Sequence, residues 1–125
     1  LYLKGHPSLQ DRVLFVSSPP GEPSAAFIKM NDPLGENTDR IRDRVEAGYL
    51  VRTRADVPTQ QARSGDTSRQ EAALSSGAQY VSTDYPEPSP FRSGYVVTLP
   101  GADGGSARCN PVNGPPGCTP QLIIK

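Results

Sequence analysis

The segment YLVRTR at residues 49–54 has the short, apolar and β-branched composition of a strand. Alternation along this segment places Leu50, Arg52 and Arg54 together on one face. The segments AAFIKMN at 25–31 and QYVSTD at 79–84 have the same character. Three strands of this kind, separated by polar stretches, indicate a sheet at the centre of the fold.

A helix is predicted over residues 39–47, between the first two of these strands. Ile41 and Val45 stand four positions apart and give it an apolar stripe. Thr38 is expected to cap its amino end, and Gly48 is suited to the position just after its last residue.

A second helix is predicted over residues 69–76. Ser68 and Glu71 have the spacing of a capping box, in which each side chain bonds to the other residue's backbone amide. Gly77 is expected to end this helix. We expect residues 55–66 to form a loop, further strands at 12–18 and 94–99, and a frayed strand at 121–125.

The order of elements from residue 26 to residue 84 is strand, helix, strand, helix, strand. This order predicts an α/β protein with two right-handed, parallel βαβ units. Parallel sheets are normally covered on both faces, and three or four strands with two helices leave edges open. The pattern therefore favours the last part of a larger parallel sheet or barrel.

Size and charge exclude several classes of protein. The chain has 125 residues, at most one domain, and its formal net charge is zero. Zero net charge argues against non-specific binding to nucleic acid or to an anionic membrane. No apolar run approaches the roughly 20 residues of a membrane span. The 14 Pro and 12 Gly indicate many loops and a thin core.

The chain contains two cysteines and one histidine, too few for a structural zinc site with four ligands. Cys109 and Cys118 stand nine positions apart in a segment rich in Pro and Gly. This spacing predicts a local disulfide in a secreted or extracytoplasmic protein. Two free thiols are the alternative.

Several longer segments carry a family resemblance: AFIKMNDP at 26–33, GYLVRTRAD at 48–56, ARSGDTSRQEAALSSGAQYVSTDYP at 62–86, LPG at 99–101 and ARCNPV at 107–112. Together they resemble the C-terminal part of the bacterial calcium-dependent phosphoinositide phospholipase C-like family. The resemblance implies the C-terminal portion of a (β/α)8 barrel. Residues 1–86 would supply its last strands and helices, and 87–125 an extension with a strand and the Cys109–Cys118 disulfide.

The resemblance also implies an exported phosphoric diester hydrolase acting on a phosphoinositide or a related phosphodiester. Such enzymes use two catalytic histidines and a calcium site of carboxylates and an Asn, all on early strands of the barrel. His6 matches neither catalytic histidine. A whole barrel needs at least about 200 residues, so we expect catalytic residues and calcium ligands in an N-terminal half that precedes this sequence.

In such barrels the site lies at the carboxyl ends of the strands. The cations at those ends are Lys29, Arg52 and Arg54, and arginine is suited to phosphate because its planar fork gives two parallel hydrogen bonds. We therefore predict that they bind the phosphate or the inositol hydroxyls of the substrate. The alternative is that they form salt bridges at the rim with Asp56, Asp84 or Asp32.

Two further residues are candidates for substrate contact. Asp84 ends the third strand segment, where it either touches the substrate or orders a loop or a neighbouring Arg. Tyr85 is placed to stack on a sugar or inositol ring, although an aromatic residue before proline often serves only for packing. Two other functions stay open: a glycerophosphodiester phosphodiesterase-like enzyme, and a non-catalytic secreted binding module.

Overall fold

The computed structural model describes residues 1–102, 104–105 and 107–123. Its elements, in chain order, are β1 (Phe27–Lys29), α1 (Asn37–Glu46), β2 (Leu50–Arg54), α2 (Gln60–Ser64), α3 (Ser68–Ser75), β3 (Tyr80–Ser82) and α4 (Pro120–Ile123). None of the helices in these residues combines the length and the apolar composition that crossing a membrane requires.

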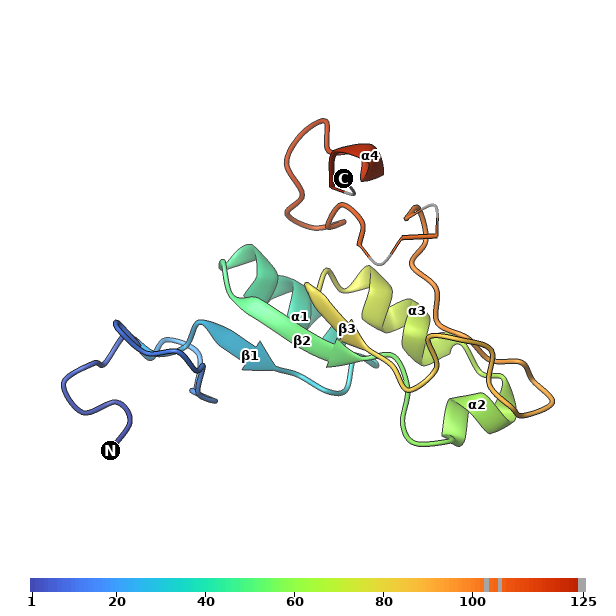
Figure 1. Cartoon of the computed structure of the whole chain (residues 1–125), viewed down its shortest axis with the longest axis horizontal. Coiled ribbons are helices and arrows are strands. Elements are labelled where there is room, and N and C mark those ends of the chain that lie inside the picture. The colour runs from blue at the N-terminus through green and yellow to red at the C-terminus, as the bar shows by residue number, and fades with distance from the viewer. Residues whose placement is uncertain (103, 106, 124–125) are drawn as a thin grey trace.

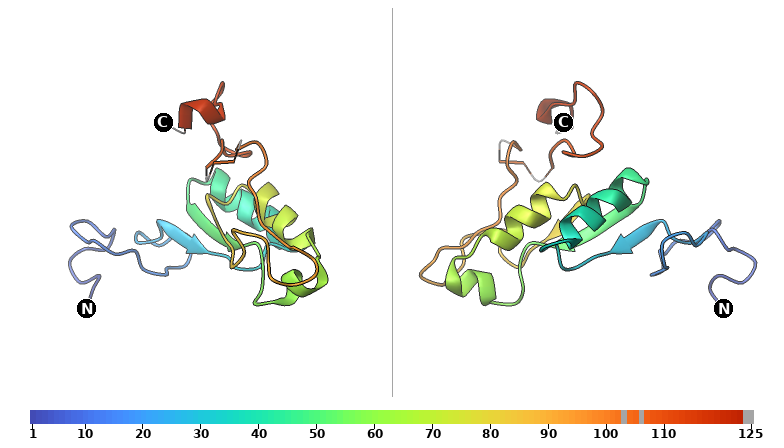
Figure 2. Two further views of the ribbon diagram at one scale, coloured as in Figure 1. Left: turned by 45° about the vertical axis from the view of Figure 1, so that its right-hand side comes forward. Right: turned by 180° about the vertical axis from the view of Figure 1, so that it is seen from behind.

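The three strands form one parallel sheet in the order β1-β2-β3, so the predicted strand–helix–strand–helix–strand arrangement is confirmed. Helices α1 and α3 cover one face of the sheet, and none of the helices in the described residues lies on the other face (Figures 1 and 2). The sheet does not close on itself. The fold is therefore α/β and consistent with a portion of a (β/α)8 barrel.

The core lies between β2 and the helices. Val51 and Thr53 of β2 are fully buried, whereas Arg52 and Arg54 between and beyond them are only partly buried. Ile41 and Val45 of α1 pack against Val51. The predicted apolar stripe of this helix is therefore the face that meets the sheet, and each such buried side chain stabilises the fold by about 1.5–3 kcal/mol.

Helix ends differ in detail from the prediction. Gly48 and Gly77 follow α1 and α3 with φ of +88° and +82°, as expected for residues that end a helix. Thr38, however, lies inside α1 and donates its hydroxyl hydrogen bond to the carbonyl of Pro33, so its predicted capping role is wrong. The Thr38 hydroxyl therefore bonds to the loop before α1 and not to an amide of the helix, and the helix begins at Asn37.

The predicted capping box of Ser68 and Glu71 is also wrong, by one residue. Ser68 is the first residue of α3, and Thr67 precedes it. The Thr67 hydroxyl donates to Glu71 Oε1 at 2.6 Å. The Ser68 amide instead donates to the Asp66 carboxylate at 2.9 Å, because an acidic side chain two residues earlier reaches the same donor.

The predicted disulfide between Cys109 and Cys118 is present. It closes a loop that lies against the amino-end side of the sheet. Asn110 Nδ2 donates to the carbonyl of Gly77 at 2.7 Å, and Val112 packs against the core of α1 and β2. A Cβ on Gly77 would lie 2.3 Å from Val112 Cγ2, so only glycine permits this close approach.

Two predicted strands are wrong. Residues 12–18 form no strand; they belong to an N-terminal segment that extends away from the sheet (blue in Figure 1), and Val13 is 93% exposed. Residues 94–99 also form no strand. Separate contacts tether them instead: the Val97 amide donates to the carbonyl of Tyr85, and the Tyr95 ring is buried. The first segment has the apolar, β-branched composition of a strand and the second has an alternating pattern, but among the described residues no neighbouring strand pairs with either.

Two further expectations need correction. The segment 55–66 is not wholly a loop, because it contains the short helix α2. This helix follows Thr59, which has a left-handed backbone with φ of +61°, so no capping pattern announces it. At the end of the chain, Pro120–Ile123 form helix α4 rather than a frayed strand, and residues 124–125 lie outside the described residues.

Candidate functional site

The uncovered face of the sheet changes character along the strands. Near the strand starts it is aromatic: the rings of Phe27 and Tyr80 lie 5.7 Å apart, and Phe15 stacks on Phe27 at 6.0 Å. Towards the carboxyl ends it is polar and positively charged. The predicted cations belong to this second half. They lie on the same face of the sheet, as the alternation in the sequence predicts.

Arg52 stands at the centre of the polar half. Its Nη1 donates to Asn31 Oδ1 at 2.6 Å, and its Nη2 donates to Ser82 Oγ at 2.7 Å. Both partners are neutral, and no carboxylate pairs with Arg52 among the described residues. The guanidinium is therefore held in position from both neighbouring segments without a carboxylate partner among the described residues.

Lys29 lies beside Arg52. The two residues are register partners on β1 and β2, so their side chains leave the same face about 5 Å apart at the backbone. Lys29 is exposed, and within the described residues its ammonium group has no hydrogen-bond or ion-pair partner. The pair therefore forms a small positively charged surface without internal neutralisation, which is suited to an anion.

Arg54 is in a different state from Arg52. Its Nη2 lies 3.5 Å from Asp84 Oδ2, with 27% and 54% of the two side chains exposed. For Arg54 the structure therefore contains a salt bridge at the rim, which is the alternative to substrate binding. An exposed pair of this kind contributes little to stability, about 0–1 kcal/mol. It does place a donor and an acceptor side by side at the strand ends.

The two other carboxylates of the rim have other partners. Asp32 accepts a hydrogen bond at 2.9 Å from Arg69 Nη1, and Arg69 Nη2 donates to the carbonyl of Asn31. Asp56 is fully buried and accepts hydrogen bonds from the Thr83 hydroxyl and the Asp84 amide. Neither of them neutralises Arg52 or Lys29.

Tyr85 lies on the side of the C-terminal segment. Its ring meets the ring of Tyr95 edge-on, with centroids 5.7 Å apart. Burial, and then the negative charge of Asp56, raise the pKa of Tyr95 to about 12, and the Tyr95 hydroxyl donates to the carbonyl of Ala55. Tyr85 is thus part of an aromatic contact that attaches this segment to the end of β2.

The structure brings four of the five predicted site residues to one end of the sheet: Lys29, Arg52, Arg54 and Asp84. Asn31 and Ser82, which orient Arg52, were not predicted as site residues. The sequence does place both at the carboxyl ends of predicted strands, in the same region as the predicted site residues. Only the register between the strands determines that these two residues, and not others at the strand ends, bond to Arg52.

The single histidine does not belong to this site. His6 Nδ1 lies 2.8 Å from the carbonyl oxygen of Gln10, within the N-terminal segment that leaves the sheet at the amino end of β1 (Figure 1). The strand ends point in the other direction. The described residues therefore offer no histidine for acid–base chemistry at the cation cluster.

A calcium site needs several oxygen ligands around one point, with carboxylates foremost. The carboxylates of Asp32, Asp56 and Asp84 bind Arg69, Thr83 and Arg54 respectively. Among residues 1–102, 104–105 and 107–123, no three acidic, histidine or cysteine side chains gather in a way that could hold a metal. These residues do not fit calcium, and we assign it no ligand here.

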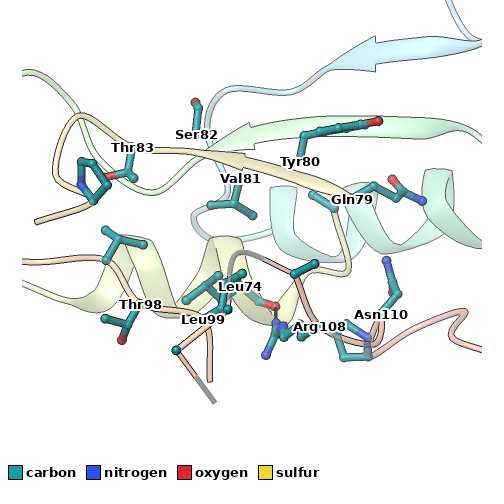
Figure 3. A pocket seen from close by; sticks show the side chains of 17 residues that line it. Leu74, Gln79, Tyr80, Val81, Ser82, Thr83, Thr98, Leu99, Arg108 and Asn110 are labelled. Atoms are coloured by element: carbon teal, nitrogen blue, oxygen red, sulfur yellow. Dashed lines mark hydrogen bonds between the residues drawn. The ribbon is translucent and has the colours of Figure 1, made fainter. Parts of the chain in front are cut away.

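A large cavity lies along the free edge of β3 rather than over the cations. It measures about 1070 Å³ and is lined mainly by β3, by Leu74 of α3 and by described residues of the C-terminal part, among them Val97, Leu99 and Arg108. Figure 3 shows Val81 on the cavity side of β3, whereas Ser82 points towards the open face. Within the described residues β3 pairs with β2 alone, and the cavity lies beside it.

Comparison with known proteins gives one match. The family model of Ca2+-dependent phosphoinositide phospholipase C matches residues 1–111. The chain belongs to this family. Membership confirms the resemblance read from the sequence and relates the chain to the phosphodiester-cleaving hydrolases of the phospholipase C kind. Neither the search of curated proteins nor the search of solved structures gave a match.

Proposed function

We propose that this chain is the C-terminal part of an exported phosphoric diester hydrolase of the phospholipase C type, in which it binds the substrate headgroup. Arg52 and Lys29 bind the phosphate. The Arg54–Asp84 pair binds hydroxyl groups of the inositol ring, because arginine donates and aspartate accepts hydrogen bonds. The observation that carries the proposal is the oriented but unneutralised guanidinium of Arg52 beside Lys29.

The open sheet supports a larger barrel around this chain. One face of the sheet lacks helices, as the interior of a (β/α)8 barrel does, and the cations lie at the carboxyl ends of the strands, where active sites of such barrels are found. The free edge of β3 and the cavity beside it leave room for another strand. An N-terminal half of the same barrel supplies the remaining strands and the catalytic histidine pair. It also supplies the ligands of the calcium that the family name implies.

Export is supported by the Cys109–Cys118 disulfide, because such bonds persist in oxidising compartments. Residues 1–86 act as the barrel portion and 87–125 as an extension that is fastened to it. In the complete enzyme, general acid–base groups cleave the phosphodiester while this half holds the headgroup in place. Holding the substrate in the reactive geometry lowers the entropic part of the activation barrier and so raises the rate of cleavage.

The binding claim is tested by titrating the chain with inositol 1-phosphate, using Arg52→Gln and Arg40→Gln. Arg40 is a matched control, because it is an exposed arginine that donates to a neutral Asn37 on α1. Charge-assisted hydrogen bonds contribute about 1.5–3 kcal/mol, so Arg52→Gln should weaken binding about tenfold or more. Arg40→Gln should change it less than twofold. Equal losses in both variants, or no binding by the unaltered chain, would overturn the proposal.

The reaction class needs the complete reading frame. Calcium-dependent release of inositol phosphate from a phosphoinositide is the expected result. Preferential cleavage of water-soluble glycerophosphodiesters would point to the glycerophosphodiester phosphodiesterase alternative. An upstream sequence without a histidine pair and a carboxylate cluster would point to the non-catalytic binding module.

A further inference from the structure

Asp56 has an unusual environment for an aspartate. It follows β2 directly after Ala55, and its side chain is fully buried. No Lys, Arg or His forms an ion pair with it in the part of the chain that the structure describes. Burying a carboxylate away from cations is costly unless hydrogen bonds compensate. The two donors that compensate here therefore indicate what the carboxylate does.

Both donors come from the turn that follows β3. The Thr83 hydroxyl donates to Asp56 Oδ2 at 2.5 Å, and the Asp84 amide donates to Asp56 Oδ1 at 3.1 Å. The same Thr83 oxygen accepts a hydrogen bond from the Tyr85 amide at 2.9 Å. Three successive residues are thus fixed, directly or through one atom, by a single buried carboxylate.

The turn determines where the Asp84 side chain points. Asp84 is more than half exposed and its contact with Arg54 is long, at 3.5 Å. An exposed ion pair of this kind does not hold two long side chains in one geometry by its own strength. The Asp84 backbone, however, is attached to Asp56 in the interior. The geometry of the exposed Arg54–Asp84 pair is therefore determined by the buried contact between the Asp84 backbone and Asp56.

We infer that Asp56 is a positioning residue for headgroup recognition: it fixes the Thr83–Tyr85 turn, so that Asp84 and Arg54 face the ligand as one donor–acceptor pair. The inference rests on the proposed function, because it gives this pair the recognition of ring hydroxyls. Asp56 itself does not touch the ligand. Its effect should therefore appear in selectivity for a hydroxyl-bearing ligand rather than in binding of phosphate alone.

The experiment compares the affinities for inositol 1-phosphate and for inorganic phosphate in Asp56→Asn, Asp84→Asn and the double variant. Asparagine keeps the shape of the buried side chain. It cannot accept hydrogen bonds through both terminal atoms. Asp56→Asn should lower the preference for inositol 1-phosphate about tenfold and leave phosphate affinity nearly unchanged. The double variant should lose no more than Asp84→Asn alone. The control, Asp43→Asn on the exposed side of α1, should change neither affinity.

The other results decide either against both proposals or against the positioning role alone. If the unaltered chain binds neither ligand, the proposed function fails and the inference fails with it. If it binds both, but Asp56→Asn weakens both equally or leaves the preference unchanged, the proposed function stands and the positioning role is wrong. Additive losses in the double variant also contradict positioning, because Asp56 and Asp84 would then act independently.

Thr83→Val provides a second route if Asp56→Asn does not fold. Valine matches threonine in shape but lacks the hydroxyl that joins Asp56 to the Tyr85 amide. Amide hydrogen exchange should then rise at least tenfold at Asp84 and Tyr85 and stay unchanged in α1, with the same loss of preference. Unchanged exchange, or unchanged preference, in a folded Thr83→Val variant would overturn the inference.

Discussion

The two faces of the sheet differ in almost every physical respect, although the same three strands form both. On the covered face Ile28, Val51 and Thr53 are buried, and α1 and α3 lie on this side of the sheet (Figure 2). On the open face Lys29 and Arg52 have no ion-pair partner among the described residues, and none of the described helices covers this face (Figure 1). Alternation along five residues of β2 is enough to separate the two roles.

The difference shows which contacts stabilise the chain and which are available to a ligand. Apolar burial stabilises the covered face, and the disulfide loop adds contacts at the amino end of the sheet. The hydrogen bonds of Arg52 orient a charge on the open face. Substitutions on the two faces should therefore have separable effects.

The largest stability effect is expected from Ile41→Ala on the covered side. Ile41 is fully buried against Val51, and removing its side chain leaves a cavity that the small core cannot fill. The free energy of unfolding should fall by about 2–5 kcal/mol. Leu50→Ala is the matched control on the open face, where Leu50 is 37% exposed, and it should lower stability by less than half as much. Urea denaturation measures both values, and similar losses would contradict the difference between the faces.

A smaller effect is expected from replacing Cys109 and Cys118 together by Ser. The bond closes a loop across a separation of nine residues, and chain-entropy reasoning gives about 2–3 kcal/mol for a loop of this size. The loss should also loosen Val112, which the loop packs against the core. Urea denaturation of the variant and of the reduced unaltered chain should give the same midpoint. A midpoint equal to that of the oxidised chain would show that the loop is held by its other contacts.

The smallest of the three effects concerns pH at the carboxyl end of the sheet. Burial, followed by the charge of Asp56, raises the pKa of Tyr95 to about 12 from a usual value of 10.0. The folded protein thus binds this proton more tightly than the unfolded chain does. The corresponding stability is fully present below about pH 10 and is lost as the pH rises through about 12.

Tyr95→Phe tests this directly. It removes the hydrogen bond to the Ala55 carbonyl, so stability at pH 8 should fall by about 1 kcal/mol. Between pH 10 and 12 the variant should lose less stability than the unaltered chain, because the titrating hydroxyl is gone. Urea denaturation across this range measures the slope. Parallel slopes would mean that the pKa of Tyr95 does not differ between the folded and the unfolded state.

The sequence predicts the arrangement of the sheet well where helical and strand periodicities alternate. The three paired strands, the apolar stripe of α1 and the glycines after two helices all follow from local pattern. The strands predicted at 12–18 and 94–99 do not form, although their local pattern is equally strong. A strand needs a partner to satisfy its backbone, and local sequence carries no information about the partner.

The amino-acid sequence by itself determined the family, the order of β1, β2 and β3 with their helices, the disulfide and the face on which the cations lie. Only the tertiary structure decided which arginine pairs with a carboxylate and which has neutral partners. Arg52 meets Asn31 and Ser82, which lie 21 and 30 positions away, whereas Arg54 meets Asp84. The physical reason is that charge neutralisation depends on groups within about 4 Å, and strand register alone sets which distant residues come that close.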